Sequence, residues 1–187
     1  EPADLALVGG RVLSVFTGEV LQADVAVVEG SVAGVGAGYR AAEAVVDVSG
    51  TILLPGFIDG HMHLETTKLT LDQFARAALR WGTTTVVLDP HEIANVLGVP
   101  GVRSLLAGAA DVPLDAFVMV SSCVPASPFE SSAETVTADD ISALLADEPG
   151  AIGLAEMMDY PAVVAGDADA VAKLLAAQGR HIDGHAP

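Results

Sequence analysis

From Thr51 onward, short apolar segments alternate with segments of helical periodicity, and this alternation restricts the fold more than any other feature of the chain. One segment carries apolar residues at the spacing of a single helix face: Leu71, Phe74, Ala75, Ala78 and Leu79. The predicted strands are residues 51–58, 83–88, 116–121, 151–157 and 181–184, with a helix in each interval. Strands that alternate with helices in this way predict an α/β fold with a parallel sheet.

The residues before this region have a different pattern. Residues 1–54 contain short apolar stretches separated by glycine-containing turns, and no helical period competes with them. They predict a small β-layer, and a unit of this size buries too little surface to be stable alone. We therefore expect two parts, a β-segment of a flanking domain over residues 1–54 and a β/α region over residues 55–187.

The β/α region is short for a complete barrel. An eight-fold (β/α) barrel needs about 250 residues, whereas residues 55–187 number 187 − 54, or 133. The sheet is therefore either open with five strands or an incomplete (β/α)8 TIM-type barrel. Polar residues gather at the carboxyl ends of the predicted strands, where barrels carry their chemistry, and this favours the incomplete barrel.

Composition excludes several classes of partner. Eight Lys and Arg residues against 25 Asp and Glu residues give a net charge of −17, which disfavours nucleic acids and anionic membranes. The single cysteine, Cys123, rules out an internal disulfide and a cysteine-rich zinc module within these residues. These features predict a soluble protein of a reducing compartment, the cytoplasm.

Histidines and a glutamate at the strand ends have the pattern of a metal site. His61 and His63 are two residues apart, so both imidazoles point to one face of an extended strand. Glu156 ends the fourth predicted strand and His185 follows the fifth. This set of nitrogen and oxygen donors suits Zn, Mn or Fe, and such an ion favours hydrolysis over redox chemistry.

Three other polar positions have weaker interpretations. His91 and Glu92 can both face a pocket only from a loop or a helix start; they predict either a plain helix N-terminus or residues that contact substrate or metal ligands. Cys123 has no recognisable basic partner nearby and is interpreted as a structural thiol. His181 begins its strand and is expected to lie away from the site.

Six segments, taken in order, carry a resemblance to a known family. The sequence Pro-Gly-Phe-Ile-Asp-Gly-His-Met-His over 55–63 resembles the amidohydrolase superfamily, in which this histidine pair follows the first barrel strand. The later segments resemble the bacterial adenine deaminases of that superfamily, in which a glutamate replaces a carboxylated lysine at the end of strand four. These segments are residues 82–85, 89–96, 122–126, 153–161 and 182–187.

The resemblance implies a site and a reaction. It implies a binuclear centre of Mn, Fe or Zn in which His61 and His63 bind one ion, Glu156 bridges, and His185 binds the second. It also implies an enzyme of purine metabolism, in which hydroxide on the metal attacks C6 of adenine and gives hypoxanthine and ammonia. Glu156, His91 and Glu92 are then the expected catalytic residues, the last two for proton handling.

The same resemblance implies residues that this chain does not contain. The family has a further metal-binding histidine after strand six and an aspartate after strand eight, and both positions would follow Pro187. We expect the 187 residues alone to be inactive, and to associate with a second copy or with the missing half of the barrel. Three alternatives stay open: an amidohydrolase for another cyclic amide or amidine, a non-catalytic metal-binding fragment, and a metal-free open α/β domain.

Overall fold

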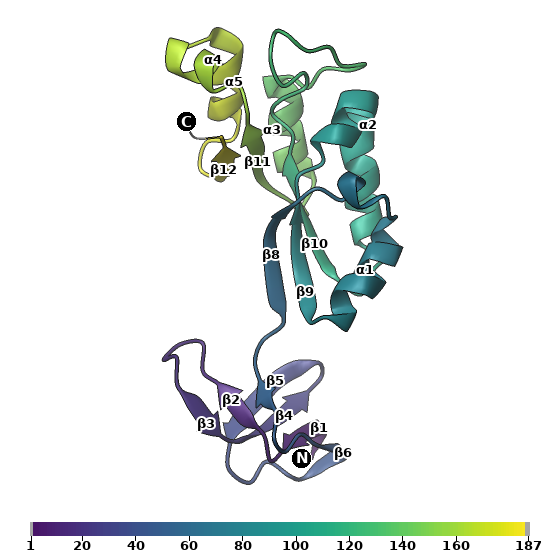
Figure 1. Cartoon of the computed structure of the whole chain (residues 1–187), viewed down its shortest axis with the longest axis vertical. Coiled ribbons are helices and arrows are strands. Elements are labelled where there is room, and N and C mark those ends of the chain that lie inside the picture. Colours follow the sequence, from purple (N-terminus) through teal and green to yellow (C-terminus); the bar gives the residue numbers. More distant parts are fainter. Residues whose placement is uncertain (1, 186–187) are drawn as a thin grey trace. The chain divides into compact units, whose positions relative to one another are not determined.

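The chain forms two compact units, Glu1–Pro55 and Gly56–Pro187, here called the N-terminal unit and the barrel unit. The structure is a computed structural model that describes residues 2–185. Figure 1 traces both units along the chain. Among the described residues, no helix combines the length and apolarity that a membrane crossing requires.

The N-terminal unit contains two small sheets, with strand orders β5-β4-β1-β6 and β3-β2-β7. Asp24 ties its turns together, because the buried carboxylate accepts hydrogen bonds from the Gly9 and Gly38 N–H groups at 3.0 and 3.2 Å. The Arg40 guanidinium lies 3.3 Å from the same carboxylate. The strands are β1 (Ala3–Val8), β2 (Arg11–Leu13), β3 (Val20–Gln22), β4 (Asp24–Val28), β5 (Ser31–Gly36), β6 (Ala42–Asp47) and β7 (Ile52–Leu53).

The barrel unit is built on five parallel strands in the order β12-β11-β10-β9-β8. The strands are β8 (Phe57–Met62), β9 (Thr83–Leu88), β10 (Asp115–Val120), β11 (Ala151–Met157) and β12 (His181–Gly184). Each strand is followed by helical structure until β12, as Figure 1 shows. The five-stranded parallel sheet, its intervening helices and the additional N-terminal strands confirm the predicted fold class.

Helices cover one face of this sheet. They are the 3-10 turn η1 (Glu65–Thr67) and helices α1 (Leu71–Arg80), α2 (His91–Ala109), α3 (Ala138–Asp147), α4 (Tyr160–Ala165) and α5 (Ala168–Ala176). The core between helices and sheet takes alternate residues of the central strands, such as Val118 and Val120 of β10, together with Ile141 and Leu144 of α3. All four are fully buried, so this core fixes which strand residues face away from the helices.

Side chains cap the starts of two helices. Thr137 forms a reciprocal capping box with Asp140, and Asp167 accepts hydrogen bonds from the N–H groups of Asp169 and Ala170 at the start of α5. Thr70 does precede α1, but its hydroxyl bonds the Asp72 side chain rather than a helix N–H.

The structure differs from the expected order of elements in three places. The strand predicted over residues 51–58 is two strands: β7 pairs with β2 in the N-terminal unit, and β8 starts only at Phe57. Helix α2 begins at His91, directly after β9, and Gly98 with φ 60° divides it at a kink. The short helix α4 was not predicted.

Candidate metal centre

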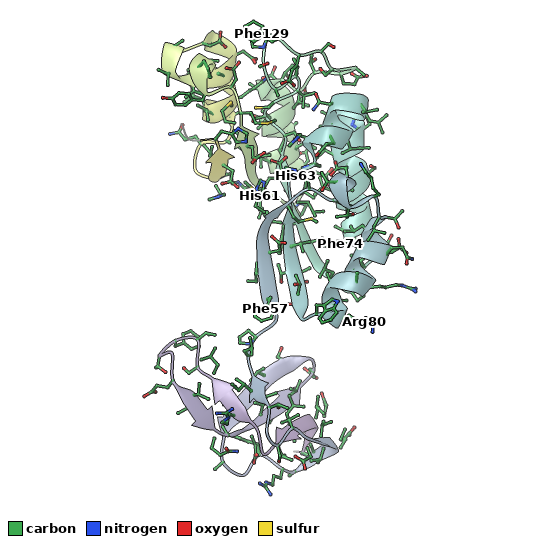
Figure 2. The ribbon with its side chains drawn as sticks, viewed as in Figure 1. Phe57, His61, His63, Phe74, Arg80 and Phe129 are labelled. Atoms are coloured by element: carbon green, nitrogen blue, oxygen red, sulfur yellow. The ribbon has the colours of Figure 1, made fainter. Side chains whose placement is uncertain are left out.

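The predicted site residues lie at the carboxyl ends of the barrel strands, where the loops of parallel α/β folds converge. His61 belongs to the end of β8 and His63 follows it, Glu156 is near the end of β11, and His185 follows β12. Figure 2 shows His61 and His63 together at this end of β8, away from Phe57 at the other end.

His61 and His63 direct ring nitrogens at each other and at Glu156. Their Nε2 atoms are 3.3 Å apart, His61 Nε2 lies 3.4 Å from Glu156 Oε1, and His63 Nε2 lies 3.9 Å from Glu156 Oε2. Two imidazole nitrogens and a carboxylate that face a common point form a donor set suited to a divalent transition ion.

The other nitrogen of each histidine faces an acceptor oxygen, at hydrogen-bond distance in His63 and farther away in His61. His63 Nδ1 lies 2.9 Å from the main-chain oxygen of Asp89, which can only accept, so Nδ1 carries the proton and Nε2 keeps its lone pair. His61 Nδ1 lies 3.6 Å from Asp183 Oδ2. Carbonyl and carboxylate partners of this kind are typical of metal-binding histidines.

His185 reaches the same glutamate from the next strand. Its Nε2 lies 3.3 Å from Glu156 Oε1, so the two oxygens of Glu156 together face His61, His63 and His185. Among the described residues, three groups have ligand atoms that all lie within 4.8 Å of one another, and His185 belongs to none of them. The groups are His61–His63–Glu156, His63–His91–Glu92 and Asp89–His91–Glu156.

His91 and Glu92 occupy the first turn of α2, so both can face the site from a helix start. His91 Nδ1 lies 3.2 Å from Asp89 Oδ1. That hydrogen bond raises the pKa of His91, partial burial opposes the rise, and the negative charges of Glu92 and Glu156 add to it. Within residues 2–185, Glu92 Oε2 is a buried oxygen without a hydrogen-bond partner, and it lies 3.7 Å from His63 Nδ1.

Asp89 is a central residue of the site that the sequence analysis did not assign. Its side chain is 1% exposed and contacts both His91 and the Glu156 N–H, the latter at 3.1 Å. Its own main-chain N–H donates to the oxygen of Met62 in β8 at 2.9 Å. An aspartate directly after an apolar strand and before Pro90 was the available signal, but its partners are distant in sequence.

Cys123 and His181 are outside the three groups of clustered ligand atoms found among residues 2–185. The Cys123 thiol is buried and hydrogen-bonded to the main chain around Glu156, and His181 contacts only Asp183 among charged side chains of the described part of the chain.

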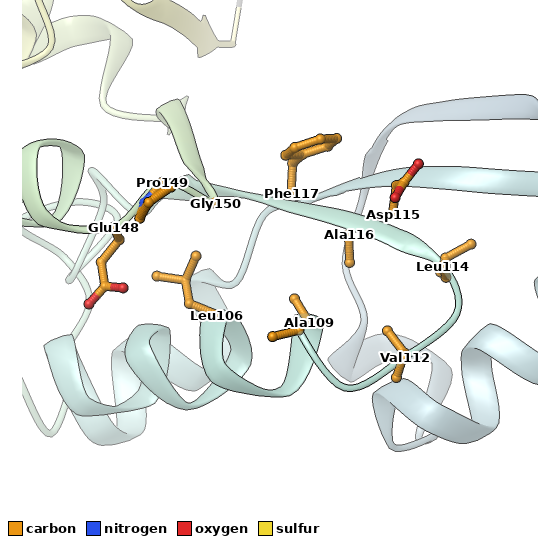
Figure 3. A pocket seen from close by; sticks show the side chains of 11 residues that line it. Leu106, Ala109, Val112, Leu114, Asp115, Ala116, Phe117, Glu148, Pro149 and Gly150 are labelled. Carbon is orange, nitrogen blue, oxygen red and sulfur yellow. The ribbon is translucent and has the colours of Figure 1, made fainter. Parts of the chain in front are cut away.

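One cavity of the barrel unit lies away from these residues. It has a volume of about 440 Å³ and opens between the end of α2, the start of β10 and the turn before β11. Figure 3 shows Leu106 and Ala109 on its helix side and Glu148 at its margin, while the Phe117 ring projects from the opposite face of β10. Because it lies at the amino end of β10, it does not connect with residues at the carboxyl ends of the strands.

The family model named Amidohydrolase family matches residues 52–186. The chain belongs to the amidohydrolase family. An adenine deaminase of Brucella suis biovar 1 (strain 1330) is 49% identical over 187 residues, which are 100% of this chain and 32% of that protein. An adenine deaminase of Syntrophobacter fumaroxidans (strain DSM 10017 / MPOB) is 50% identical over 184 residues, 98% of this chain and 31% of that protein. This amidohydrolase chain thus spans about a third of the length of the curated relatives it matches.

Solved structures support the barrel assignment. A crystal structure of an adenine deaminase gives a TM-score of 0.70 at 19% identity, covering 99% of this chain and 51% of that one. L-Hydantoinase (dihydropyrimidinase) from Arthrobacter aurescens gives a TM-score of 0.64 at 19% identity, and the match covers 83% of this chain and 33% of that one. At such identities the likeness establishes the fold alone.

Proposed function

We propose that the protein containing this amidohydrolase chain is a metal-dependent adenine deaminase that converts adenine and water into hypoxanthine and ammonia. One observation carries the proposal: His61, His63 and Glu156 direct their donor atoms at one point, in a chain about half identical along its whole length to adenine deaminases. The proposal includes a cytoplasmic location, a homo-oligomeric state and a role in purine metabolism.

The donor set fits a divalent ion. His63 Nε2 keeps its lone pair because Nδ1 is engaged by the Asp89 main-chain oxygen at 2.9 Å, and the contacts from His61 and His185 to Glu156, 3.3–3.4 Å, leave space between donor atoms. We assign His61 and His63 to one ion, His185 to a second, and Glu156 to both, with Mn as the first metal to test and Fe or Zn as the others. A divalent ion here would lower the pKa of a water molecule and make a nucleophile available near neutral pH.

The reaction requires a proton to move as well as a nucleophile. A C–O bond forms at C6 of the purine, the bond from C6 to the exocyclic nitrogen breaks, and the departing amine must gain a proton to leave as ammonia. His91 and Glu92 are the proposed proton-handling groups, with Glu156. His91 is held by Asp89 at 3.2 Å, and the free Oε2 of Glu92 can accept a proton or a hydrogen bond.

The test is ammonia and hypoxanthine formation from adenine by the whole gene product, purified with Mn²⁺, with bound metal measured in the same sample. We expect both products in equal amounts, and we expect His61→Ala and Glu156→Gln to lose most of the bound metal and the activity. His181→Ala is the matched control, because His181 is the one histidine of the chain outside the proposed roles. For residues 1–187 alone, about a third of the relatives' length, we expect metal binding without turnover.

Two results would contradict the proposal in different ways. Bound metal without adenine turnover, but with hydrolysis of hydantoin or another cyclic amide, would assign the chain to a different amidohydrolase activity. Equal metal content in the parent, His61→Ala and Glu156→Gln proteins would show that the ligand assignment is wrong.

A further inference from the structure

Strand β11 is irregular at the point where it presents Glu156. In its ladder with β12, Leu154 pairs with Ile182 and Met157 pairs with Gly184, so two residues of β11 lie opposite one residue of β12. This is the arrangement of a β-bulge, which redirects a side chain at the cost of regular pairing. On the other side, the pairing with β10 extends only to Leu154. The main chain of Glu156 therefore lies within the bulge on the β12 side and beyond the last paired residue on the β10 side.

Side chains replace the missing ladder partners. The Glu156 N–H donates to Asp89 Oδ2 at 3.1 Å, and the Glu156 oxygen accepts from Ser122 Oγ at 2.7 Å and from Cys123 Sγ at 3.1 Å. The Met158 N–H donates to the same sulfur at 2.9 Å. The thiol thus acts as a donor to one end of the bulge and as an acceptor for the other, as a neighbouring strand would.

These contacts are shielded from water. Ser122 is 2% exposed and Cys123 is 3% exposed, so water cannot readily replace the thiol if it is removed. A buried N–H or C=O that loses its partner keeps the full cost of its desolvation, and the bulge can relieve that cost only by moving.

Movement of the bulge would displace the Glu156 carboxylate. Its Oε1 lies 3.3–3.4 Å from the Nε2 atoms of His61 and His185, and its Oε2 lies 3.9 Å from His63 Nε2. Successive residues of a strand point to opposite faces, so a shift of one position along β11 would direct the carboxylate away from all three histidines.

We propose that Cys123 is a positioning residue for Glu156, whose thiol fixes the β11 bulge and so aims the carboxylate at the histidines. This role rests on the metal centre proposed above. It assigns the thiol no nucleophilic step. Ser122 shares the Glu156 oxygen, but the Met158 N–H depends on Cys123.

The experiment compares, in the whole gene product, a substitution that removes the hydrogen bonds of the thiol with one that keeps them. Cys123→Val fills the space of the thiol without any hydrogen bond, whereas Cys123→Ser keeps a donor and an acceptor. We expect Cys123→Val to weaken Mn²⁺ binding by about ten- to hundredfold, the usual effect of losing a group that orients a ligand, and Cys123→Ser to stay within about threefold of the parent. Val124→Ala is the matched control, because Val124 is an equally buried neighbour (1% exposed) with an apolar side chain.

Mn²⁺ affinity is measured by titration of metal-free protein, with circular dichroism to verify folding; Cys123→Ala replaces Cys123→Val if the latter does not fold. Unchanged affinity in Cys123→Val, or an equal loss in Val124→Ala, would overturn the positioning role while leaving the metal centre intact. A parent protein that binds no Mn²⁺, Fe²⁺ or Zn²⁺ would overturn the centre and this role together.

Discussion

Replacing Asp89 with alanine removes one carboxylate that serves two elements of the site. The Glu156 N–H, 3.1 Å from Oδ2, loses its acceptor, and an N–H left unpaired in a part-buried position costs about 1–3 kcal/mol. His91 Nδ1 loses its partner at 3.2 Å, but that side chain is 19% exposed, so water recovers part of the bond. We expect Asp89→Ala to destabilise the β11 end by roughly 2–3 kcal/mol, and Asp89→Asn, which keeps an acceptor oxygen, by about 1 kcal/mol.

Hydrogen–deuterium exchange of the Glu156 amide in metal-free protein measures this effect directly. Because each 1.4 kcal/mol is a tenfold change in an opening equilibrium, exchange in Asp89→Ala should be roughly 30- to 140-fold faster. The Ile141 amide, bonded to the Thr137 oxygen in α3, serves as the reference for opening of the whole unit. The role given to the carboxylate would be refuted if the Glu156 amide exchanged at the same rate in Asp89→Ala as in the parent. It would also be refuted if Asp89→Asn accelerated exchange as much as Asp89→Ala.

Two further predictions concern packing and pH. A Cβ at Gly153 would meet the His181 main-chain oxygen and lie 2.9 Å from Met119 Cε. Gly153→Ala should therefore lower the urea midpoint of unfolding by the equivalent of about 1–3 kcal/mol. Gly60→Ala is the control and should leave the midpoint unchanged, because a Cβ at Gly60 would have open space around it. The Gly9 N–H, with Arg40 and the Gly38 N–H, lowers the pKa of Asp24 against the opposing effect of burial. The charged Asp24 carboxylate therefore contributes fully to stability above about pH 4, and this contribution is lost as the pH falls further. The difference in unfolding free energy between the parent and Asp24→Asn should disappear over the same pH range.

The local patterns of the sequence were sufficient for the sheet and for part of the site. Apolar segments of β9, β10 and β11 were recognisable because each is buried against the helices, and the spacing of His61 and His63 places both imidazoles on one side of the chain. Helix α2 was less predictable, because Gly98 and Pro100 give its middle the composition of a turn.

Asp89 and the β11 bulge show what a sequence pattern does not contain. The bond between the Asp89 carboxylate and the Glu156 N–H joins residues 67 positions apart, and no spacing rule links such positions. The bulge depends equally on where β10 and β12 stop pairing with β11. Glu156 was predicted as a ligand from its place at a strand end, but the side chains that hold its main chain come from two other segments, Asp89 and residues 122–123.

The bond from His63 Nδ1 goes to a main-chain oxygen, that of Asp89, and not to a side chain. A carbonyl of the backbone is present whatever residue occupies position 89, so point mutation cannot delete it as it can delete a carboxylate partner. The fold itself orders this ring, so the rotational entropy of the imidazole is lost during folding. The orientation of the His63 ring is therefore expected to survive substitution at position 89.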